Sequence, residues 1–146
     1  MRVKCIYDSL ESCPQLKTQN NYFTDAILYI TLDKEYTVYS SVRMKTNNIH
    51  KQQTKYLIIN DLNLPSLHPV WLFEILDSKM ACADWHFRHY VENNLPGFDK
   101  HLVEFILGYR ELVSDDLKHF LGLFQGNEDD LKIFQKWREV IDELYH

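Results

Sequence analysis

The spacing of apolar positions changes along the chain, from short strand-like runs to longer repeats near residue 97. The two most apolar short runs are residues 56–59 and 70–76, and both are rich in β-branched and aromatic side chains. This pattern predicts two strands at the centre of a small sheet. Pro65 and Pro69 interrupt the segment between them, which predicts a connecting loop.

Three further segments show strand-like patterns. Residues 2–7 alternate, with Val3, Cys5 and Tyr7 on one side, and predict a first strand with one face inward. Residues 35–42 alternate most cleanly and predict one strand. Residues 85–91 predict a further strand or a short turn.

From residue 98 the apolar positions recur at helical spacing and predict three helices. The first covers 98–113, with Phe98, Leu102, Phe105, Ile106, Tyr109, Leu112 and Val113 on its apolar side. The second should be capped by Ser114, with a stripe formed by Leu117, Phe120, Leu121 and Phe124 before a stop at Gly126. The third should be capped by Asn127, with a stripe formed by Leu131, Phe134, Trp137, Ile141 and Leu144.

Strands followed by helices predict an α+β fold rather than a parallel α/β fold. With 146 residues, of which 45% are hydrophobic, the chain is long and apolar enough for one folded domain. We therefore expect a single domain, 1–146, mainly β over 1–95 and mainly α over 97–146.

Cysteine usage and the N-terminal residues indicate a cytoplasmic protein. Cys5, Cys13 and Cys82 are an odd number without a C-x-x-C pair, so a disulfide framework is not expected. The first residues lack the apolar core of a secretory signal, and no run is long enough to span a membrane.

The charge is unevenly distributed. Residues 1–96 hold ten Lys and Arg against ten Asp and Glu, whereas residues 97–146 hold six against eleven, so the whole net charge of -5 belongs to the C-terminal third. Such a surface suits a basic protein partner, although it also suits plain solubility. The candidate contact residues are the acids at the predicted helix starts: Asp115, Asp116, Glu128, Asp129 and Asp130. Capping alone also explains these acids.

A basic stretch gives an alternative interface. Arg43, Lys45, Lys51 and Lys55 lie in or beside a polar segment over 43–55 that predicts an exposed hairpin loop. These cations could contact phosphates of a nucleic acid. No aromatic side chains alternate with them, so base stacking is unsupported and a solvated hairpin tip is the simpler interpretation.

Catalytic and metal chemistry has little support in the sequence. Cys82, His86 and His89, with Asp84 between them, lack the paired spacing of a zinc site, and His86 and His89 should face opposite sides of a strand. His50, His68, His101 and His119 could act as general bases, but sequence supplies no partner for them. Nucleophile-elbow, phosphate-loop and dinucleotide motifs are missing. We therefore expect no enzyme activity, no metal, no cofactor and no small-molecule substrate.

The N-terminal part resembles a known group of proteins. T-L-D-K-E-Y-T-V-Y (31–39) is similar to the L-T-x-G-K-x-Y-x-V-Y stretch of small bacterial proteins with an SH3-like sheet, with Asp33 where the group often has Gly. Y-L-I-I-N-D, P-V-W-L-F-E-I-L-D and D-W-H-F-R-H-Y then follow in the same order as in that group. Many of these proteins resemble immunity proteins of polymorphic toxin and contact-dependent growth inhibition systems.

The resemblance implies an antiparallel SH3-like sheet, followed here by about three helices. It also implies binding to the C-terminal domain of a cognate toxin, expected to be a basic nuclease, whose active site would be occluded. It identifies no binding residues, because the shared motifs are scaffold motifs. The first alternative is an SH3-like nucleic-acid-binding or regulatory module that uses the loop 43–55. The second is a hydrolase that uses the Cys82–His89 region.

Overall fold

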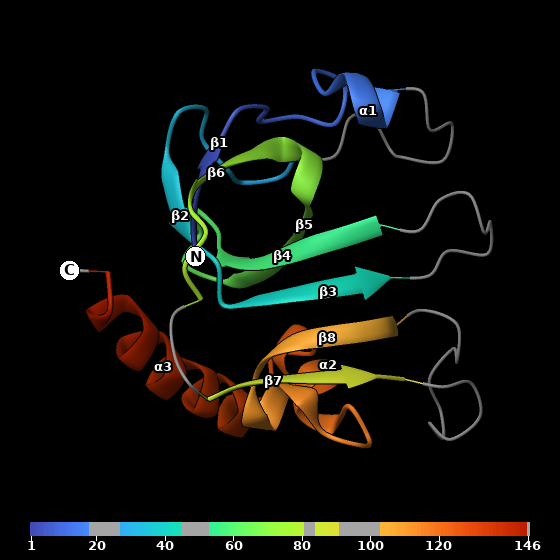
Figure 1. Ribbon diagram of the computed structural model, residues 1–146, viewed down its shortest axis with the longest axis vertical. Helices are drawn as coiled ribbons and strands as arrows, with labels where there is room; N and C mark the ends of the chain where they lie inside the picture. The colour runs from blue at the N-terminus through green and yellow to red at the C-terminus, as the bar shows by residue number, and fades with distance from the viewer. Residues whose placement is uncertain (18–26, 45–52, 81–83, 91–102, 146) are drawn as a thin grey trace.

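The described residues form two antiparallel sheets and a C-terminal pair of helices (Figure 1). This computed structural model describes residues 1–17, 27–44, 53–80, 84–90 and 103–145. The smaller sheet has the order β2 (Glu35–Thr37), β1 (Arg2–Cys5), β6 (Phe73–Asp77). The larger has the order β5 (Pro65–Pro69), β4 (Gln53–Ile59), β3 (Ser40–Met44), β8 (Val103–Tyr109), β7 (Trp85–His89). The predicted α+β class is confirmed.

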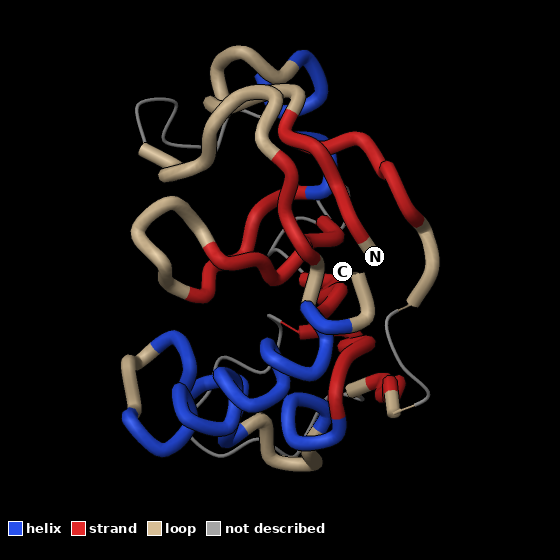
Figure 2. The backbone as a smooth tube through the Cα atoms, turned by 90° about the vertical axis from the view of Figure 1, so that its left-hand side faces the viewer, coloured by secondary structure: helices blue, strands red, loops and turns tan. Residues whose placement is uncertain are grey.

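Helical segments occur at both ends of the chain. Near the N-terminus there is α1 (Pro14–Lys17), and two 3-10 helices, η2 (Val70–Leu72) and η3 (Arg110–Val113), follow later. The C-terminal α-helices are α2 (Lys118–Phe124) and α3 (Glu128–Glu143). Figures 1 and 2 place α2 and α3 at the opposite end of the molecule from α1. None of the described helices is both long and apolar enough to span a membrane.

The first predicted strand is confirmed, because β1 buries Val3 and Cys5 completely. The prediction of one strand over 35–42 is wrong, since this segment forms the end-to-end strands β2 and β3 in different sheets. The change occurs at two consecutive residues. Val38 donates its N–H to Met1 and packs in one core, whereas Tyr39 donates to Leu57 and packs in the other.

The two apolar runs at 56–59 and 70–76 do form strands, but the prediction that they share a sheet is wrong. β4 lies inside the larger sheet, and β6 lies at an edge of the smaller one after the turn η2. The predicted loop between them is also wrong, because β5 pairs with β4 along its full length. Pro65 and Pro69 are tolerated there because an edge strand leaves one side without ladder hydrogen bonds.

The predicted helix over 98–113 is wrong for its described part, which forms β8 and η3. β8 lies between β3 and β7. Its pairing with β3 shifts register next to Glu104, and such a bulge adds one residue to the strand. Val103 and Ile106, three residues apart, can therefore both face the core as they would on a helix. Strands thus continue beyond the expected boundary at residue 97.

The other two predicted helices are present. Gly126, with φ +72°, ends α2; its N–H donates to Leu123, and the N–H of Asn127 donates to Gly122. The Asn127 side chain then caps α3, accepting from Asp129 N and Asp130 N at 3.1 and 3.2 Å. The predicted cap at Ser114 is wrong, since α2 begins at Lys118 and its first N–H is accepted by Asp116.

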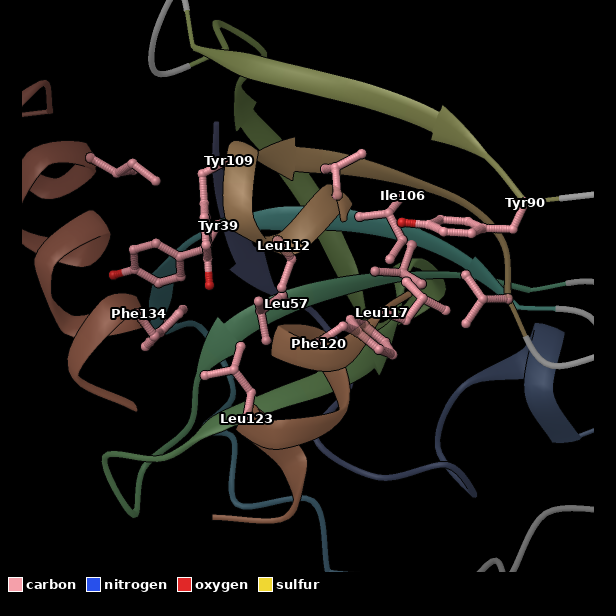
Figure 3. Close-up of a cluster of buried hydrophobic side chains, with 14 residues drawn as sticks. Tyr39, Leu57, Tyr90, Ile106, Tyr109, Leu112, Leu117, Phe120, Leu123 and Phe134 are labelled. Carbon is pink, nitrogen blue, oxygen red and sulfur yellow. The ribbon is translucent and has the colours of Figure 1, made fainter. Parts of the chain in front are cut away.

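The helices cover one face of the larger sheet. Tyr39, which directly precedes β3, and Leu57 and Ile106 from the sheet meet Phe120 and Phe134 from the helices in one buried cluster (Figure 3). A second cluster lies between the smaller sheet and the other side of β4, where Tyr56 and Ile58 point. β4 therefore contributes side chains to both cores.

Candidate functional site

The predicted acidic residues lie at the starts of α2 and α3, and a side-chain contact joins these two helix starts. His119, in the first turn of α2, has its Nδ1 2.7 Å from Oδ1 of Asp130, in the first turn of α3. Asp115, Asp116, Glu128 and Asp129 around this junction are exposed. Asp115 forms an ion pair with Arg88, and Asp129 lies 3.9 Å from Lys132. The N–H of Lys118 holds the pKa of Asp116 below its usual value.

Asp130 differs from the other four acids because its carboxylate faces inward. The His119 ring joins it to the buried Tyr109, whose hydroxyl lies 2.8 Å from Nε2 of His119. Gly122 makes room for this arrangement, since a Cβ there would fall 1.7 Å from Oδ2 of Asp130. Asp130 is therefore a structural link between the helices, and four of the five predicted acids can meet a partner.

The predicted basic loop is partly strand. Arg43 belongs to β3 and its Nε lies 3.1 Å from Oε2 of Glu104, while Lys55 belongs to β4 and is partly buried. Lys45 and Lys51 lie outside the described residues. The β3–β4 register confirms a hairpin, but the two cations that the structure describes do not extend from its tip.

The histidine candidates that the structure describes do not gather into one metal or acid–base cluster. His86 and His89 are exposed on β7, and Cys82, His50 and His101 lie outside the described residues. Within the described ranges, no group of three or more His, Cys, Asp or Glu side chains could hold a metal ion. Cys5 and Cys13 are buried free thiols.

A polar cleft of about 480 Å³ lies between β2, the turn after β4 and the last turns of α3. Three cations, Arg2, Lys34 and Arg138, and three acids, Glu35, Asp61 and Asp142, line it. Each cation is paired with one of these acids: Arg2 with Glu35, Lys34 with Asp61 at 2.6 Å, and Arg138 with Asp142 at 3.6 Å.

Buried tyrosines hold two of the cleft's carboxylates in place. Asp61 accepts from Lys34, from Thr31 Oγ1 at 2.7 Å and from the Tyr36 hydroxyl at 2.9 Å. Burial alone would raise the pKa of Asp61, but these hydrogen bonds lower it below its usual value. Asp142 accepts from the Tyr39 hydroxyl at 2.7 Å. The cleft is thus neutralised by its own residues.

A second cavity, of about 320 Å³, was not foreseen from the sequence. It is lined by Lys55 and, on β5, by Ser66 and His68, with apolar residues around them. Ser66 Oγ lies 2.8 Å from Nε2 of His68. Burial, and then the charge of Lys55, lowers the pKa of His68 to about 4. The sequence signal for the Ser66–His68 pair is the alternation of residues 66–68, which lies in a segment predicted to be a loop.

Comparison with known proteins gives no relative: no family model, no curated protein and no solved structure matches this chain.

Proposed function

We propose that this chain is an immunity protein that binds a cognate toxin domain in the bacterial cytosol and occludes its active site. The observation that carries the proposal is the exposed acidic group at the joined starts of α2 and α3, formed by Asp115, Asp116, Glu128 and Asp129. The resemblance of residues 31–39 and the later motifs to SH3-like immunity proteins supports the same function.

The acidic group suits a cationic substrate cleft, such as that of a nuclease. Arg88 and Lys132 lie beside two of its carboxylates, but exposed ion pairs contribute little and exchange readily for a partner's cations. The negative potential would raise the association rate, and buried contacts elsewhere would set the residence time. The His119–Asp130 contact fixes the two helix starts, so the acids are positioned before the partner arrives.

The test is co-expression with the toxin C-terminal domain encoded immediately upstream, followed by size exclusion and a growth-rescue assay. A stable complex with rescued growth supports immunity. Neither complex nor rescue, with a folded and active toxin domain, rejects it.

A charge-matched pair of variants tests the proposed surface. One variant carries D115N, D116N, E128Q and D129N. Its control removes the same number of exposed acids elsewhere, through D8N, E11Q, D84N and E143Q. We expect the first to slow association about tenfold at low salt and the control to change it little. Equal association rates for the two variants would remove the acidic group from the interface.

The nucleic-acid alternative is not favoured by the described cations, because Arg43 faces Glu104 and Lys55 is partly buried.

A further inference from the structure

The cavity beside β5, which we name the Lys55 cavity, is built from two parts of the chain. β4 and β5 supply Lys55, Ser66, Leu67, His68 and Pro69. Leu10, the segment 27–29 and Asn60 complete the described lining. Its volume of about 320 Å³ is at the lower end of small-molecule pockets, which span about 300–1,000 Å³.

Among the described residues of this lining, Lys55 alone carries a permanent charge. No hydrogen bond or ion pair joins its ammonium to any described residue, and burial lowers its pKa below the usual value. Taking a charge out of water is costly unless an opposite charge accompanies it. The cavity therefore holds a cation whose counter-ion does not come from the described chain.

His68 does not share that positive charge at neutral pH. Its pKa of about 4 leaves the ring neutral, because burial and then the charge of Lys55 disfavour the protonated form. A neutral ring can exchange a hydrogen bond with Ser66, whose hydroxyl is a further neutral polar group of the lining. The described polar residues of the cavity are thus one lysine and several neutral groups.

Apart from Asn60 and Tyr29, the remaining described lining is apolar. Leu10, Leu28, Leu67 and Pro69 line the cavity, and so does Ile27, which is 74% exposed. A ligand with a hydrocarbon tail would remove Ile27 from water, which is favourable. A purely polar anion, by contrast, would gain nothing from these walls.

We propose that the Lys55 cavity binds a small organic carboxylate with an apolar tail, whose carboxylate pairs with the Lys55 ammonium. This inference is independent of toxin binding and can fail or succeed without affecting the proposed immunity function.

The experiment uses octanoate as the probe, with octylamine and octanol as tail-matched controls. Binding to the full chain is measured by calorimetry and by ligand-observed NMR at neutral pH. We expect octanoate to bind, octanol to bind more weakly, and octylamine not to bind, because the ammonium repels it.

The variant K55M retains the apolar stem and removes the charge. We expect it to weaken octanoate binding about tenfold or more, whereas K34M, in the polar cleft, leaves binding unchanged. No octanoate binding to the wild-type chain overturns the proposal, and so does equal binding of octanoate and octylamine. The second comparison uses only the wild-type chain, so it stands even where K55M does not fold.

Discussion

The polar cleft and the Lys55 cavity differ in how their charged side chains are paired. In the cleft, three cations face three acids, and buried tyrosines hold two of those acids. In the cavity, one cation lies among apolar walls without an acid from the described chain. Both spaces border the turn after β4, since Asn60 lines each of them.

The two spaces differ in whether their charged groups are already paired within the protein. The cleft's charges stabilise the fold by satisfying one another, so a ligand there would have to displace existing partners. Lys55 has no such partner among the residues that the structure describes, so a bound anion would compensate its charge without displacing one of them. A larger hollow with more charges is therefore the less promising ligand site of the two.

The largest expected effect is the pH dependence caused by His68. Its pKa falls from 6.5 in the unfolded chain to about 4 in the folded one, so the folded state favours the neutral ring. The resulting stability, about 3 kcal/mol, is complete above pH 6.5 and is lost as the pH falls toward 4. Urea unfolding at several pH values should show this loss for the wild type and a smaller one for H68Q. A control, H86Q on the exposed strand β7, should behave as the wild type; identical pH profiles for all three would contradict the prediction.

The second effect concerns the cleft's internal pairing. D61A removes the acceptor of Thr31, Lys34 and the buried Tyr36 hydroxyl. We expect a loss of about 2 kcal/mol in the free energy of unfolding, measured by urea denaturation. The exposed D8A is the control and should change stability little. A D61A chain as stable as the wild type would show that the cleft is not held by this carboxylate.

The third prediction is a stabilising substitution, unlike D61A. Without a ligand, K55M should raise the free energy of unfolding by about 1 kcal/mol, because it removes an uncompensated, partly buried charge. The measurement is the denaturation midpoint of the unliganded chain. A clear destabilisation would mean that Lys55 already has a stabilising contact.

The smallest expected effect is that of K34M, which makes the same Lys-to-Met change in the polar cleft. Lys34 is half exposed and pairs with Asp61, so K34M should lower the free energy of unfolding by about 0.5 kcal/mol. Destabilisation by K34M and stabilisation by K55M in the same denaturation assay would support the difference between the two spaces. A stability change of the same sign for both variants would contradict it.

Local signals predicted the parts of the fold that depend on local chemistry. Asn127 caps α3 and Gly126 ends α2 because both roles depend on neighbouring backbone groups. β8 could not be distinguished from a helix, because its bulge at Glu104 places apolar residues three apart on one face. The sheet change between Val38 and Tyr39 depends on distant partners, which a single sequence does not reveal.

The candidate sites show the same division. Acids at the helix starts were predictable from capping rules, but the inward turn of Asp130 depends on Gly122 and His119 from another helix. The Lys55 cavity depends on the register of β4 against β5, and the prolines of β5 had suggested a loop. The sequence spacing of Lys55, Ser66 and His68 does not indicate that these three residues line the same cavity.

The most direct test of the difference between the two spaces is an NMR titration of the Lys55 side-chain nitrogen, with and without octanoate. We predict a pKa below the usual lysine value in the free chain, because burial disfavours the ammonium. Added octanoate should raise that pKa, since a bound carboxylate favours the charged form. An ordinary lysine pKa that does not respond to octanoate would contradict the view that Lys55 is a partly buried cation whose counter-ion is a bound carboxylate.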